Sequence, residues 1–130
     1  MPTAVRLLTA AVSLACLAAC DQDPLGLSER AIGANYVLER AESNYFLIDA
    51  NHPDTVGGVI EGVVLAIGWD QQRIVVERHS IFRGDPDGFL IIDLKTRAMR
   101  GPLTREALTA DPEVGAIKLL PAAQAWESLH

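Results

Sequence analysis

Short apolar runs separated by polar, turn-forming residues make up most of the chain after residue 35. The runs are rich in β-branched and aromatic residues, as is typical of strands. Six of them are expected to be strands, namely 36–40, 45–49, 59–67, 73–80, 89–94 and 98–100. Tight polar turns separate the two members of the first and last pairs, and residues 69–72 form such a turn in the middle pair. The pattern therefore predicts three successive hairpins, which form an antiparallel meander.

The predicted strand at 59–67 and the last thirty residues refine this fold class. Both faces of the 59–67 alternation are largely apolar, which is typical of a strand covered on two sides or curled into a barrel. Gly101-Pro102 is expected to end the meander. Thr104 can cap a short helix at 105–109, and Pro121 suits the first turn of a final helix at 122–129. We therefore predict a mainly β (α+β) fold, with a twisted or barrel-like sheet and short C-terminal helices.

Composition limits the size and the partners of this fold. A chain of 130 residues that is 49% hydrophobic and 22% charged can bury one core, so a single domain is expected. Lys and Arg number 11 against 17 Asp and Glu, which gives a formal net charge of −6. Phosphate groups repel such a chain, and we expect no nucleic-acid partner.

The first nineteen residues have the pattern of a secretory signal peptide. Arg6 provides the one charge, and residues 7–19 are uncharged. This apolar stretch is shorter than the roughly 20 residues that span a bilayer, but it suits the apolar region of a signal peptide. The domain plan is then a signal at 1–19, a linker at 20–30 and one β-rich domain at 31–130.

The segment Leu17-Ala18-Ala19-Cys20 resembles the lipobox of bacterial lipoproteins. The resemblance implies that Cys20 carries a lipid and becomes the mature N-terminus, so that the bilayer is a partner. Removal of Cys16 with the signal would leave the mature chain without a free thiol. Asp21 resembles the signal for retention in the inner membrane and favours its periplasmic face, with the outer membrane left open. Ordinary cleavage after Ala19 and an uncleaved anchor are the alternatives.

Three segments of the body also resemble small bacterial lipoproteins of unknown function. They are a hairpin in which Ala-Ile-Gly-Trp-Asp at 66–70 is followed by Ile-Val-Val at 74–76, a Phe-Leu-Ile-Ile-Asp strand at 89–93 and a Gly-Pro-Leu-Thr entry into a helix at 101–104. The resemblance spans about residues 66–108. It implies a small extracytoplasmic β-rich domain and brings no activity with it.

No motif in the sequence predicts a metal site or a cofactor site. His52, His79 and His130 lack the spacing of metal ligands, with His79 expected near a strand end. The segment 84–88 contains two carboxylates beside glycines but lacks the remaining ligands of a calcium loop, so a solvated loop is expected. Gly57-Gly58 is expected to form a turn or a bulge. We expect neither a metal site nor a cofactor.

The candidate catalytic residues are few, and each has a simpler interpretation. The serines are outside any nucleophile motif; they are Ser28, Ser43, Ser80 and Ser128. Glu61 and Glu77 could face each other across paired strands, but a solvated or salt-bridged face with Arg73 and Arg78 is the preferred interpretation. Arginines cluster in the sequence near the third hairpin, at positions 97, 100 and 105. We expect Arg97, Arg100 and Arg105 to pair with local carboxylates.

These observations favour a non-enzymatic, periplasm-facing lipoprotein that binds a protein partner or assists the envelope. No catalytic residue is assigned, and Cys20 is the one modification site. An inhibitor or immunity protein that neutralises a basic toxin or hydrolase is the alternative, motivated by the negative charge. A small hydrolase that uses Glu61, Glu77 or the Asp85/Asp87 loop is the remote alternative.

Overall fold

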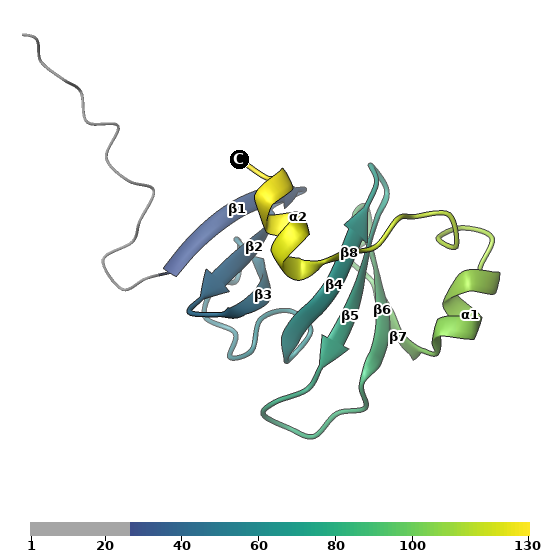
Figure 1. Ribbon diagram of the computed structural model, residues 1–130, viewed down its shortest axis with the longest axis horizontal. Coiled ribbons are helices and arrows are strands. Elements are labelled where there is room, and N and C mark those ends of the chain that lie inside the picture. The colour runs from purple at the N-terminus through teal and green to yellow at the C-terminus, as the bar shows by residue number, and fades with distance from the viewer. Residues whose placement is uncertain (1–26) are drawn as a thin grey trace, which may run out of the picture.

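The computed structural model describes residues 27–130, so the signal peptide and Cys20 lie outside the described residues. Strands β1 (Leu27–Gly33), β2 (Tyr36–Ala41) and β3 (Asn44–Asp49) form an antiparallel sheet in the order β1-β2-β3. The predicted hairpin is formed by β2 and β3, which pair Tyr36 with Asp49 and extend to the pair Ala41 and Asn44. Figure 1 shows this small sheet beside a larger one.

The larger sheet has five antiparallel strands in the order β7-β6-β5-β4-β8. They are β4 (Val63–Trp69), β5 (Arg73–His79), β6 (Gly88–Asp93), β7 (Met99–Leu103) and β8 (Leu120–Pro121). Two short helices complete the fold, α1 (Arg105–Ala110) and α2 (Ala122–Ser128). The mainly β prediction with short C-terminal helices is confirmed, although the strands form two separate sheets and not one barrel-like sheet.

Apolar side chains cover both faces of the five-stranded sheet. On one face, Ile67, Ile74 and Ile92 join the core with residues of the small sheet and with Trp126 of α2. Figure 1 shows α2 across the space between the two sheets. On the other face, Val75 and Ile91 pack with the segment around α1. Both faces of the sheet are therefore apolar, which explains why its strands read as continuous hydrophobic runs.

Several element boundaries differ from the prediction, and three of the differences have a clear physical cause. Residues 59–62 form turns and β4 begins at Val63, because positive φ angles at residues 57, 58, 61 and 62 interrupt the extended chain. β1 takes in residues 27–30, which the sequence assigns to a linker, because its backbone pairs with β2. Gly101-Pro102 does not end the last strand, since β7 continues to Leu103 and pairs it with Phe89. Among the described helices, none is long and apolar enough to cross a bilayer.

Candidate functional site

A buried carboxylate, Glu61, organises the loop between β5 and β6. The residue is only 4% exposed. Its Oε2 accepts a hydrogen bond from Ser80 Oγ at 2.6 Å, and its Oε1 accepts from the backbone N–H groups of Phe82 at 2.7 Å and Arg83 at 3.1 Å. The Ser80 hydroxyl, followed by these two amides, holds the pKa of Glu61 below its ordinary value of 4.5. The anionic carboxylate is therefore the form that fits this loop.

The turn before β4 directs Glu61 towards the loop. Gly62 N–H donates to the carbonyl of Gly57 at 3.0 Å, and Glu61 itself has a φ of 51°. Gly58 has a φ of +74°, and a Cβ there would lie 2.3 Å from the carbonyl oxygen of Leu47. Glycine is thus required at residue 58, since any side chain would collide with β3.

A second set of polar contacts fixes the other end of the loop. Asp87 accepts hydrogen bonds from Ser80 N–H at 2.9 Å and contacts His79 Nδ1 at 2.9 Å. Arg78 is 5% exposed, and its guanidinium donates to the backbone carbonyls of Ile60 and Pro86. The loop at 80–88 is therefore connected both to the turn before β4 and to β5.

Apolar side chains protrude from this polar scaffold. Val56 is 71% exposed, Ile81 43% and Phe82 57%. The Phe82 ring lies against Gly57, where a Cβ would be 2.9 Å from Phe82 Cδ2. We call Val56, Ile81 and Phe82 the apolar tip. In Figure 1 the loop that holds Ile81 and Phe82 projects from the lower ends of β5 and β6.

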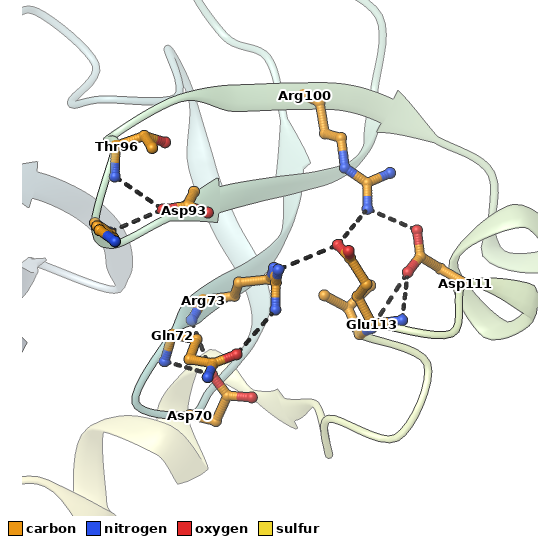
Figure 2. Close-up of polar contacts among 10 residues, drawn as sticks. Asp70, Gln72, Arg73, Asp93, Thr96, Arg100, Asp111 and Glu113 are labelled. Atoms are coloured by element: carbon orange, nitrogen blue, oxygen red, sulfur yellow. Dashed lines mark hydrogen bonds and ion pairs between the residues drawn. The ribbon is translucent and has the colours of Figure 1, made fainter.

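A separate cluster of ion pairs lies at the opposite end of the same strands. Figure 2 shows Glu113 between two arginines, with Arg73 Nη2 at 3.2 Å and Arg100 Nη2 at 3.9 Å from its Oε2. Arg100 also reaches Asp111 at 2.6 Å, which lowers the pKa of that carboxyl. Asp93 accepts from the backbone of residues 95 and 96. The adjacent cavity of about 200 Å³ is thus lined by groups that already have partners.

The structure confirms several predicted contacts. Each of the three clustered arginines pairs with a carboxylate, in the pairs Arg97–Asp49, Arg100–Asp111 and Arg105–Glu77. His79 ends β5, as expected. Trp69 ends β4, and the Asp70 side chain accepts from the backbone N–H groups that follow it, which closes the hairpin.

One predicted contact is wrong. Glu61 and Glu77 do not face each other across paired strands, because Glu61 lies in the turn before β4 and Glu77 pairs with Ala66. Arg78 contacts backbone carbonyls and Arg73 contacts Glu113, so neither arginine joins the two glutamates in an ion pair.

Sequence reasoning missed the apolar tip and the role of Glu61. The one local signal is the pair Ile81-Phe82 inside an otherwise polar loop. Among residues 27–130, no three His, Cys, Asp or Glu side chains gather as metal ligands would. Comparison with models of protein families, with curated proteins and with solved structures found no match for this chain. The function is therefore argued from the tip and the groups that hold it.

Proposed function

We propose that this chain is a non-enzymatic, lipid-anchored binding module of the bacterial envelope, with the apolar tip as its contact surface for a protein partner. The main observation is that Ile81 and Phe82 of the tip are exposed while the backbone of their loop is fixed. Ile81 and Phe82 extend from a loop that three hydrogen bonds to the buried Glu61 hold in place.

A fixed apolar loop has an energetic advantage in binding. Ordering a free loop on association costs about 0.5–1.5 kcal/mol for each immobilised side chain. Here the chain itself has already ordered the backbone of Phe82 and Arg83 through Glu61. Large aromatic anchors also dominate the energetics of many interfaces. Phe82 therefore has the features of a central binding residue.

The charges around the tip favour one kind of partner. Asp85 and Asp87 belong to the same loop, where they pair with Arg83 and His79 respectively. The whole chain has a formal net charge of −6. A partner with an apolar pocket and a basic rim fits these features. They also fit the alternative function, in which this chain inhibits a basic toxin or hydrolase.

The carboxylates considered for a hydrolase have other partners. Glu61 and Asp87 hold the loop, Glu77 pairs with Arg105 and Asp85 pairs with Arg83. These contacts indicate that the four carboxylates stabilise the fold. A binding role is therefore preferred to the hydrolase alternative.

The lipid anchor is proposed from the segment Leu17-Ala18-Ala19-Cys20. Six residues separate Cys20 from the start of β1 at Leu27. Even fully extended, they would reach no more than about 25 Å. A lipidated Cys20 would thus keep the domain close to the bilayer. Asp21 favours the periplasmic face of the inner membrane, and the outer membrane is the alternative.

The variant Cys20→Ser is expected to abolish lipid attachment and to move the protein out of the membrane fraction. The reason is that serine lacks the thiol that forms the thioether, whereas Cys16→Ser, the matched control, leaves that thiol intact. The measurement is incorporation of radiolabelled fatty acid, together with membrane fractionation. Equal labelling of wild type and Cys20→Ser would refute the anchor.

The contact surface is tested by photo-crosslinking from position 82. A photoreactive residue that replaces Phe82 is expected to capture a partner in intact cells, because Phe82 is 57% exposed at the centre of the proposed interface. A residue of the same kind at Met99, which is 47% exposed on β7, is the control.

A further inference from the structure

A groove remains uncovered on the five-stranded sheet, on the face that α1 and the segment after it cover only in part. Its volume is about 460 Å³, and it opens between β4, the start of α1 and the base of the loop at 80–88. Glu77 on β5 pairs in register with Phe89 on β6, and Phe89 pairs with Leu103 on β7. Residues paired in this way point to the same face, so these three line the floor.

The β4 side of the groove is formed by a bulge. The pairing of β4 with β5 shifts between Val64 and Ala66, which leaves Leu65 without a partner in the ladder. Leu65 is 48% exposed and lines the groove. The groove thus has Leu65 on its β4 side and one carboxylate, Glu77, on its floor.

A side chain of the chain itself, Arg105, already lies in this groove. Its Nη2 is 3.5 Å from Glu77 Oε2, and its guanidinium carbon is 4.9 Å from the centre of the Phe89 ring. The Arg105 side chain is 68% exposed and that of Glu77 28%. An exposed pair at this distance is held weakly, so another cation can displace Arg105 at low cost.

The other charged groups that line the groove are Asp87 and Arg78, whose opposite charges offset each other. Asp87 contributes a carboxylate at the rim and contacts His79. Arg78 also lines the groove, but its guanidinium is turned to the backbone carbonyls of Ile60 and Pro86. Once Arg105 is displaced, the lining has two carboxylates, Glu77 and Asp87, against one arginine, and this excess of one negative charge suits a single cation.

We propose that this groove binds a basic peptide segment of the partner, and that an arginine of this segment replaces Arg105 over Phe89 and pairs with Glu77. The proposal rests on the proposed binding function and names the chemistry of the partner. Arg105 acts as an internal competitor that occupies the subsite in the absence of the partner. The apolar neighbours of the arginine would contact Leu65 and Leu103.

The test uses the full chain in detergent and a fluorescent peptide with the core Leu-Arg-Leu. In the Arg105→Ala background, where no internal arginine competes, Glu77→Gln is expected to weaken binding about two- to fivefold, because the carboxylate that pairs with the peptide arginine is lost. The variant Arg105→Ala is expected to strengthen binding about two- to fivefold, because removal of a competitor worth up to about 1 kcal/mol raises the affinity by this factor. A merely structural role of Arg105 would not produce tighter binding.

Two controls separate this site from general attraction to an acidic protein. Glu113→Gln removes an arginine-paired carboxylate outside the groove and should leave the affinity unchanged. A peptide with norleucine in place of arginine should bind the Arg105→Ala variant about two- to fivefold more weakly than the arginine peptide. The proposal would be overturned if Glu77→Gln and Glu113→Gln lowered the affinity for the peptide equally. It would also be overturned if Arg105→Ala lowered this affinity.

The outcomes also separate this proposal from the proposed function. If position 82 captures a partner but the peptide does not bind, the groove proposal fails and the contact surface stands. If the peptide behaves as expected but position 82 captures nothing, the groove stands and the apolar tip fails as a contact surface.

Discussion

Replacement of Trp126 with alanine is expected to lower the free energy of unfolding by about 3–5 kcal/mol. Trp126 is 1% exposed and packs in the core between the two sheets. Arg30 stacks on its ring at 4.4 Å, and the same guanidinium donates to the carbonyls of Trp126 and Leu129. The substitution therefore removes the packing that attaches α2 to β1. Urea unfolding followed by circular dichroism measures the loss.

The control for this substitution is Glu127→Ala. Glu127 is the next residue of α2 and is exposed, so its replacement is expected to change stability by no more than about 0.5 kcal/mol. Trp126→Phe should recover much of the loss, because the indole N–H has no hydrogen-bond partner among residues 27–130. An unfolding midpoint of Trp126→Ala equal to that of Glu127→Ala would contradict the proposed role of α2.

Replacement of Glu61 with alanine is expected to release the loop at 80–88 while the fold persists. Ser80, Phe82 and Arg83 would each lose their hydrogen bond to the carboxylate. Exchange of the backbone amides of Phe82 and Arg83 should accelerate about tenfold or more, since local opening no longer breaks these bonds. Hydrogen exchange at single-residue resolution is the measurement, with Glu113→Ala as the exposed control.

The stability difference between wild type and Glu61→Ala is expected to depend on pH. Because the folded-state pKa of Glu61 lies below 4.5, its anionic form adds stability that is complete above about pH 4.5. This contribution is lost as the pH falls through the folded-state pKa. The difference in unfolding free energy between wild type and Glu61→Ala should therefore be constant from pH 7 to about pH 5 and shrink below pH 4.5. A difference that grows on acidification would contradict this role of the carboxylate.

Local pattern was sufficient to predict the hairpins of this fold. The runs at 36–40 and 45–49 predict a pair that the structure forms as β2 and β3. Thr104 caps α1 as predicted, since its hydroxyl accepts from the N–H of Ala107 at 3.1 Å. Both signals lie within a few residues of the structure that they specify, which explains why they could be read from sequence.

The features that were missed depend on distant contacts. The alternation at 59–67 indicates a strand from Val59, but the turn prevails because Gly58 fits against β3. β1 contains charged residues and follows a linker-like segment, and its pairing with β2 is what makes it a strand. Glu61 bonds to residues 19–22 positions further along the chain, and no local pattern signals such a contact.

The most direct test of the account is photo-crosslinking from position 82 in intact cells, with benzoylphenylalanine in place of Phe82. The account predicts one discrete crosslinked product at position 82 and none at position 99, although both side chains are exposed. It also predicts that Glu61→Ala, combined with the probe at position 82, reduces the yield at least about fivefold, because the loop is no longer pre-ordered. The absence of a product at position 82, or equal products at both positions, would contradict the claim that the apolar tip is the contact surface.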